Sequence, residues 1–197
     1  MKALREARYW VFDMDGTLTL AVHDFPAIKR ALGIPEGDDI LHHLAALPAD
    51  EAAAKHAWLL EHERELAVAS RPAPGAIELV RELSERGCQL GILTRNAHEL
   101  ALLTLQAIGL DDCFARADIL GRDEAPPKPH PGGLLHLAQR WAVAAQDLVM
   151  VGDYRFDLEC AQAAGARGVL VNLPDNPWPE LTELHAQDCA QLLAQLR

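Results

Sequence analysis

The chain has 197 residues, and because half of them are hydrophobic and 24% are charged, its composition is that of a soluble globular protein with a sizeable core. The formal net charge of −11 argues against non-specific binding to nucleic acids or to anionic membranes. No apolar run approaches the length of a membrane span, and the apolar run near the N-terminus is too short for a signal peptide. The four cysteines form no CxxC pair, so we expect reduced thiols in a cytoplasmic protein, with a monomer as the default state.

The first predicted element is a buried strand at residues 8–13, a short apolar run that ends in a carboxylate. Residues 20–71 then carry no convincing strand pattern, but helical patterns at 25–32, 40–47 and 50–69 that are separated by prolines and a glycine. The stretch ends in the linker-like sequence Ser70-Arg71-Pro72-Ala73-Pro74-Gly75. We therefore predict a small all-α cap at 20–71, inserted after the first strand of a core domain made of 1–19 and 72–197.

Strands and helices alternate along the rest of the chain. We predict helices at 76–86, 97–108, 132–141 and 156–164, several of them followed by a glycine, and strands at 89–93, 118–120, 148–151 and 168–171. This alternation implies right-handed crossovers and a parallel sheet with helices on both faces. The predicted fold class is therefore α/β, a Rossmann-like three-layer core, followed by a loop at 172–179 and a short helix near 189–196.

Polar residues follow several of the predicted strands at the point where each strand ends. The first strand ends in Asp13-Met14-Asp15-Gly16-Thr17, the second in Thr94-Arg95-Asn96, and a later one in Gly152-Asp153 with Asp157 four residues on. Lys128 lies between prolines in a loop. Ligands of open α/β sheets bind outside the carboxyl ends of the strands, so we expect these groups to form one site.

Four aspartates at one edge of a sheet need positive charge nearby. Two like charges about 4 Å apart repel by roughly 4 kcal/mol at an effective dielectric near 20. Lys128 and a divalent cation are the obvious compensation, and an oxygen-rich set of ligands suits Mg²⁺. Asp13 and Asp15 are two residues apart and would point the same way on a regular strand. Asp153 and Asp157 are four apart and would share one face of a first helical turn.

The Thr94-Arg95-Asn96 sequence leads into a predicted helix, whose free N–H groups and dipole favour a bound phosphate. Thr94 adds a hydroxyl at the strand end. Asn96 with Glu99 also fits the N-x-x-E capping box, so a structural role for Asn96 stands beside the ligand role.

Together these residues resemble the haloacid dehalogenase superfamily, and especially its phosphoglycolate phosphatase-like branch. The resemblance covers about residues 9–171 and rests on four motifs in family order. They are the DxDGTLT sequence at 13–19, the apolar strand ending in Thr94, the Lys128-Pro129 pair, and the GDxxxD sequence at 152–157.

The resemblance implies a Mg²⁺-dependent phosphatase that hydrolyses a small phosphorylated metabolite. Asp13 would be the nucleophile that forms an acyl phosphate, and Asp15 would protonate the leaving oxygen and then activate water. Thr94 and Lys128 would stabilise the transferring phosphoryl group, with Arg95 and Asn96 as further substrate-binding candidates. The implied Mg²⁺ ligands are Asp13, the backbone carbonyl of Asp15, Asp153 and Asp157.

The predicted insert resembles the family's helical cap, which closes over the site and excludes water. It is shorter than the four-helix caps common in this branch, and it lacks the Asp that often follows the GTL sequence shortly afterwards. Candidates for substrate contact in the cap are His23, Lys29, His42, His43, Lys55 and Arg64. For each of them a solvent-exposed position is the favoured interpretation.

Other functions remain open at this point. A sugar-phosphate mutase would use the same motifs, and a phosphonate-cleaving relative would need a desolvated cap lysine. A dehalogenase of this family would lack Asp15, which is present. A phosphate-sensing or partner-binding module would have lost a catalytic position, and none is lost.

Overall fold

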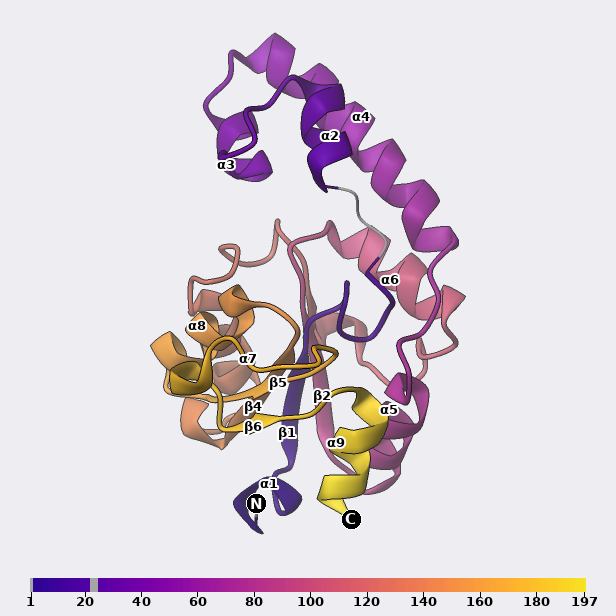
Figure 1. Ribbon diagram of the computed structural model, residues 1–197, viewed down its shortest axis with the longest axis vertical. Helices are drawn as coiled ribbons and strands as arrows, with labels where there is room; N and C mark the ends of the chain where they lie inside the picture. The colour runs from indigo at the N-terminus through magenta and orange to yellow at the C-terminus, as the bar shows by residue number, and fades with distance from the viewer. Residues whose placement is uncertain (1, 22–24) are drawn as a thin grey trace.

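The computed structural model describes residues 2–21 and 25–197, and it contains one parallel sheet of six strands in the order β3-β2-β1-β4-β5-β6 (Figure 1). The strands are β1 (Tyr9–Phe12), β2 (Gln89–Leu93), β3 (Ile119–Leu120), β4 (Leu148–Gly152), β5 (Arg167–Leu170) and β6 (Leu184–His185). The strand order reverses at β1, where the second strand along the chain pairs on one side and the fourth on the other. This is the place where open α/β sheets bind their ligands.

The register of β1 brings the ends of three strands together. Phe12 is aligned with Ile92 of β2 and with Val151 of β4. The next residue, Asp13, donates its backbone N–H to the Val151 carbonyl at 2.9 Å. The residues that follow these three strands therefore meet at one edge of the sheet.

Helices cover both faces of the sheet, as the alternating pattern predicted. On one face, α5 (Ala76–Glu85), α6 (His98–Ala107) and α9 (Cys189–Leu196) share a core cluster with Trp10 and Phe12 of β1. On the other face, α7 (Gly132–Arg140) and α8 (Arg155–Ala164) share a second cluster with Val11. Both sides of β1 are thus buried, which is why its sequence is a continuous apolar run.

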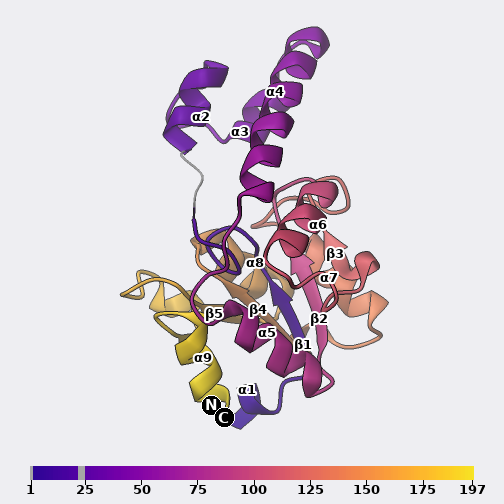
Figure 2. The ribbon, with the colours of Figure 1, turned by 90° about the vertical axis from the view of Figure 1, so that its right-hand side faces the viewer.

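We call residues 20–71 the cap. Its helices α2 (Phe25–Leu32), α3 (Ile40–Ala45) and α4 (Ala49–Val68) lie beyond the carboxyl ends of the strands (Figures 1 and 2). They have a small core of their own, made of Ile28, Leu32, Ile34, Leu44 and Leu59. The C-terminal part of α4 descends to the core and contacts α6.

The two chain segments that join the cap to the core run side by side. The Leu20 N–H bonds to the Arg71 carbonyl, and the Ala73 N–H bonds to the Leu18 carbonyl, both at 2.9 Å. Thr19 and Pro72 form an antiparallel bridge between these bonds. This small ladder fixes both ends of the cap to the same point of the core.

The long predicted elements are present, with ends that differ by one or two residues. The short elements α1 (Lys2–Arg5) and β6, and the 3-10 turns at Arg116–Asp118, Ala145–Asp147 and Pro179–Leu181, were not predicted, because two to four residues carry no periodic signal. All four cysteines are free. Among the described residues, no helix combines the length and the apolar character that crossing a bilayer requires.

Candidate active site

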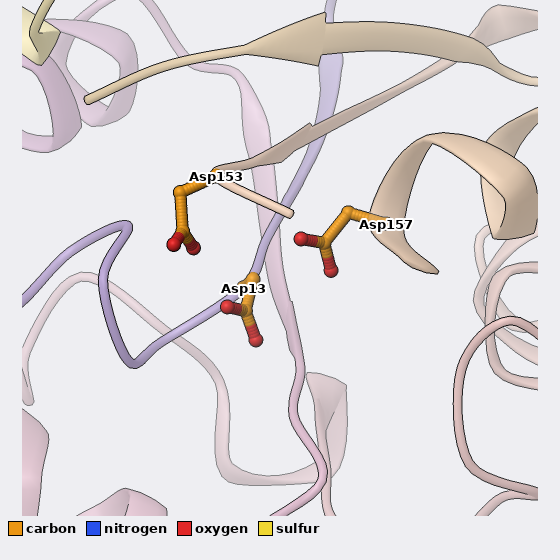
Figure 3. A group of neighbouring side chains, drawn as sticks. All are labelled: Asp13, Asp153 and Asp157. Carbon is orange, nitrogen blue, oxygen red and sulfur yellow. The ribbon is translucent and has the colours of Figure 1, made fainter. Parts of the chain in front are cut away.

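Three carboxylates converge where β1 and β4 end. Asp13 directly follows β1, Asp153 directly follows β4, and Asp157 lies in the first turn of α8. Their side chains point toward one another (Figure 3), and one oxygen from each lies within 4.8 Å of the others. Asp13 and Asp157 are buried, and Asp153 is partly exposed. This compact set of hard oxygen ligands is suited to a small divalent cation.

Lys128 supplies positive charge at the same point. Its ammonium lies 2.5 Å from Asp13 Oδ1 and 2.6 Å from Asp157 Oδ1, and the side chain is only 3% exposed. Burial alone would lower the pKa of Lys128, but the two carboxylates outweigh it and raise the pKa. The prolines around Lys128 leave it in a loop, where the Lys128–Pro129 peptide bond is cis.

The two remaining acids of the cluster resist ionisation. Burial, followed by the charges of Asp13 and Asp157, raises the pKa of Asp153. Burial also raises the pKa of Asp157, and Lys128 offsets part of this increase. Both shifts show that burial, together with the neighbouring carboxylates, makes the charged forms of these two acids unfavourable.

Asp153 is held from the β1 side by the turn that follows Asp13. Thr17 donates its hydroxyl to Asp153 Oδ1 at 2.8 Å. Gly16 has a left-handed conformation with φ of 84°, and a Cβ at this position would lie 2.4 Å from Asp153 Oδ2. Asn172, just after β5, donates to the carbonyls of Gly16 and Thr17 at 2.7 and 2.9 Å. The sequence indicated the turn, but it gave no sign of its support by Asn172.

Asp157 is positioned by the start of α8. Its Oδ2 accepts a hydrogen bond from the Tyr154 backbone N–H at 3.1 Å. The predicted arrangement of Asp153 and Asp157 on one helical face is wrong, because α8 begins only at Arg155. Asp153 instead reaches the cluster from the end of β4. Gly152 allows the Asp157 side chain to lie against the end of β4, since a Cβ at position 152 would lie 2.3 Å from that side chain.

Asp15 lies beside the cluster and is not one of the three converging carboxylates. Its Oδ2 accepts a hydrogen bond from Asn96 Nδ2 at 2.7 Å. Burial and, next, the charge of Asp13 raise the pKa of Asp15 to about 7. A carboxyl with such a pKa can both donate and accept a proton near neutral pH.

The Thr94–Asn96 segment faces these acids across the sheet edge. Thr94 is 3% exposed, and its Oγ1 accepts the Asn96 backbone N–H at 3.1 Å. The predicted Asn96–Glu99 capping box is wrong: α6 begins at His98, Ala97 occupies the cap position, and the Asn96 side chain binds Asp15 instead. A short, strong hydrogen bond to a carboxyl outweighs the local cap.

Among the described residues, two ion pairs join the cap to the core, and neither was predicted. Arg95 lies 2.5 Å from Asp39 of the cap, with its guanidinium 5.5 Å from the centre of the Phe156 ring. Arg122, in the loop after β3, makes two bonds of 3.0 and 3.2 Å to Glu63 of α4. Glu63 is 8% exposed, and burial raises its pKa although Arg122 partly offsets the effect.

A cavity of about 570 Å³ extends from the carboxylate cluster to the cap. All the predicted core residues line it, namely Asp13, Asp15, Thr94, Arg95, Asn96, Lys128, Asp153 and Asp157. Of the cap candidates, Lys29 lines the cavity, whereas His42, His43, Lys55 and Arg64 are not among the lining residues. His43 contacts Asp38 and Lys55 contacts Glu51, while His23 lies outside the described residues.

Comparisons with known proteins agree with this geometry. The family model for haloacid dehalogenase-like hydrolases matches residues 8–165. An uncharacterized hydrolase of Saccharomyces cerevisiae is 30% identical, covering 98% of this chain and 92% of the yeast protein. A phosphoglycolate phosphatase of Neisseria meningitidis is 31% identical, covering 85% and 81% of the two chains. The crystal structure of a hydrolase from Pseudomonas syringae has the same fold, with a TM-score of 0.77 at 24% identity over 96% of this chain and 97% of that one. The chain therefore belongs to the family of haloacid dehalogenase-like hydrolases.

Proposed function

We propose that this hydrolase is a Mg²⁺-dependent phosphatase that cleaves a small phosphate monoester through an aspartyl-phosphate on Asp13. The observation that carries the proposal is the position of Asp13. Its carboxylate lies close to two further carboxylates and to the Lys128 ammonium, and all four groups line one cavity. The phosphoglycolate phosphatases among its relatives support a phosphate ester as the substrate.

The residues present fit Mg²⁺. Mg²⁺ prefers oxygen ligands at about 2.0–2.1 Å, so ligands on opposite sides of it lie about 4 Å apart. The oxygens of Asp13, Asp153 and Asp157 already lie within 4.8 Å of one another, and the pKa values of two of them are raised. These three side chains and the Asp15 carbonyl would hold the ion, which would supply charge stabilisation to the phosphoryl oxygens.

Asp13 is the proposed nucleophile. One of its oxygens attacks the phosphorus, the ester oxygen leaves, and an acyl phosphate forms on the side chain. The Lys128 ammonium lies 2.5 Å from Asp13 Oδ1 and is therefore close to the negative charge that spreads over the phosphoryl oxygens. The Thr94 hydroxyl accepts a hydrogen bond from the backbone, which leaves its proton available to a phosphoryl oxygen.

Asp15 is the proposed general acid and base. With its pKa raised to about 7, the carboxyl can give its proton to the leaving oxygen in the first step. As a carboxylate it then takes a proton from water, the water oxygen attacks the acyl phosphate, and inorganic phosphate is released. Asn96 orients the Asp15 carboxyl through the bond to Oδ2.

The test is the release of inorganic phosphate from p-nitrophenyl phosphate with and without Mg²⁺. We expect Asp13→Asn to lower kcat by about 10⁴-fold or more, as the loss of a nucleophile does in other covalent mechanisms. Asp175→Asn is the control, since Asp175 is exposed and lies away from the cavity. Wild-type activity in Asp13→Asn, or full activity in excess EDTA, would contradict the proposal. Conversion of a sugar 1-phosphate to a 6-phosphate without phosphate release would instead indicate the mutase.

A further inference from the structure

The cavity is larger than a phosphoryl group and a small leaving group require. The whole cavity of about 570 Å³ is within the range of about 300–1,000 Å³ that is typical of pockets for drug-sized ligands. A phosphoryl group with a two-carbon acid attached to it would fill only a small part of this space. The volume therefore favours a leaving group larger than glycolate.

Part of the outer wall of the cavity is apolar and aromatic. Ile28, Ile40, Leu41 and Leu59 face it from the cap, and Phe156 faces it from the core. Tyr154 packs edge-to-face against Phe156 at 5.1 Å between ring centres. Such a wall gives favourable contact to the hydrophobic face of a ring or a carbon chain.

The two arginines of the outer wall are already paired with carboxylates. Arg95 is bound by Asp39, and Arg122 is bound by Glu63 through two hydrogen bonds. Lys29 keeps its charge, because its ammonium donates to the neutral backbone carbonyl of Glu36 at 2.6 Å, and the carboxylate of Asp38, of opposite charge, also lines the cavity. A carboxylate on the leaving group that took the place of either arginine's partner would have to displace Glu63 or Asp39 and lie beside it. Displacing Glu63 would leave a negative charge buried without its partner.

The same groups can bind a neutral polar molecule without being displaced. The Arg95 Nε is buried and has no hydrogen-bond partner among the described residues. The lining carboxylates offer free lone pairs, because each oxygen can accept more than one hydrogen bond. A wall that offers both donors and acceptors suits hydroxyl or amide groups on an uncharged ligand.

We propose that the leaving group of the natural substrate is an uncharged, hydroxylated group larger than glycolate, which packs its apolar face against the Ile28–Leu59–Phe156 wall. This proposal rests on the proposed phosphatase function, and it separates this chain from relatives that are named for phosphoglycolate. Sugar phosphates and nucleoside monophosphates share this chemistry, and the experiment distinguishes between them.

The first experiment measures kcat/KM with Mg²⁺ for phosphoglycolate, a hexose 6-phosphate, a nucleoside 5′-monophosphate and p-nitrophenyl phosphate. We expect at least one of the two hydroxylated esters to exceed phosphoglycolate by about tenfold or more, a difference of about 1.4 kcal/mol. The better of the two identifies the source of the leaving group. A smaller ratio of these two kcat/KM values, or a preference for phosphoglycolate, overturns this inference. Activity on p-nitrophenyl phosphate in that case leaves the proposed function intact. The absence of activity on all four esters overturns both.

The second experiment removes the anionic partner of Arg122, the less exposed of the two arginines. In Glu63→Gln, Arg122 loses its anionic partner and becomes available to a carboxylate on the substrate. We expect the ratio of kcat/KM for phosphoglycolate to that for the preferred ester to rise by about tenfold. Glu51→Gln is the matched control, because Glu51 lies on the same helix, is exposed and contacts Lys55 outside the cavity.

A second variant covers the case in which Glu63→Gln does not fold. Asp39→Asn frees Arg95 at the more exposed pair, where the side chains are 30% and 39% exposed. The same rise in the ratio is expected from it. An unchanged ratio in the folded variants contradicts the role of the ion pairs in rejecting carboxylates.

Discussion

Asp13 illustrates how a single residue position depends on groups from distant parts of the chain. Its backbone N–H is fixed by β4, and its carboxylate is bound by Lys128 from a loop more than 100 residues away in sequence. Asp153, which lies beside it, accepts a hydrogen bond from Thr17, and its carboxylate packs so closely against Gly16 that there is no space for a Cβ at that position. The site therefore tolerates little movement of the turn that follows β1.

The change Gly16→Ala tests this turn. A Cβ at this position would lie 2.4 Å from Asp153 Oδ2, and Asp153 cannot retreat without losing the Thr17 hydrogen bond. The left-handed conformation adds a cost of about 1–2 kcal/mol for a non-glycine residue. We expect kcat/KM to fall by about 10²-fold or more, measured by phosphate release.

Gly87→Ala is the matched control for this change. Gly87 has a similar φ of 72°, but nothing lies within 4 Å of a Cβ built there. It therefore carries the same backbone strain without a clash at the site. Equal losses of activity in the two variants would show that strain, and not the displacement of Asp153, is responsible.

The positions of Asp13, Thr94 and Asp153 could be located from the sequence because each directly follows a buried apolar strand. Such positions are marked in the sequence by a change from apolar to acidic residues, as at Phe12-Asp13 and Gly152-Asp153. The predicted capping role of Asn96 was wrong, because a local capping pattern does not reveal that a carboxyl from the turn after β1 competes for the same side chain. The roles of these residues in catalysis and metal binding remain predictions.

At the scale of the elements, the cap has a core that is separate from the two clusters of the sheet. Five buried residues make up this core, and Leu44 at its centre is fully buried. The contacts of this cluster lie within the cap. We therefore expect that the cap can lose its order while the α/β core remains folded.

The change Leu44→Ala tests this independence. Removal of a fully buried leucine side chain costs about 2–5 kcal/mol, which is large for a cluster of this size. We expect proteolytic cleavage within residues 25–68 to accelerate at least tenfold, and kcat/KM to fall, while the main thermal transition moves little. Limited proteolysis with mass spectrometry and a thermal melt measure these effects.

Leu135→Ala is the control, because Leu135 is on the surface of α7 and is 46% exposed. If cleavage in Leu44→Ala began in the core and the cap at equal rates, the cap would not be an independent unit.

The long helices and the central strands were predictable from their periodicity and from the glycines that follow them. The pairs Arg95–Asp39 and Arg122–Glu63 were not, since they depend on where α3 and α4 lie above the sheet.

At the scale of the whole molecule, the acidic site affects the stability of the fold. Burial raises the pKa values of Asp15, Asp153 and Asp157 above the ordinary value of 3.8. Between about pH 4 and about pH 7 the folded chain thus binds more protons than the unfolded chain. The free energy of unfolding therefore decreases as the pH rises through this range, and the net charge of −11 acts in the same direction.

We expect the melting temperature in EDTA to fall by several degrees between about pH 5 and about pH 7.5, which corresponds to about 2 kcal/mol. Mg²⁺ should raise the melting temperature more at the higher pH, because it binds the ionised carboxylates of the folded state. Differential scanning fluorimetry with and without Mg²⁺ measures both effects. Asp153→Asn should reduce the pH-dependent fall and the response to Mg²⁺. A melting temperature in EDTA that rises with pH would contradict the assignment of raised pKa values to these acids.

The small antiparallel ladder at Thr19 and Pro72 has a consequence for how this protein can diverge. Since the chain leaves the sheet and returns to it at hydrogen-bonded neighbours, the distance to be bridged does not depend on what is inserted between them. Loops of very different length can be closed across such a junction at a small entropic cost. Evolution can therefore exchange the whole cap, and with it the shape of the cavity above Asp13. The hydrogen bonds that hold Asp13 in place come from the core and do not depend on such an exchange.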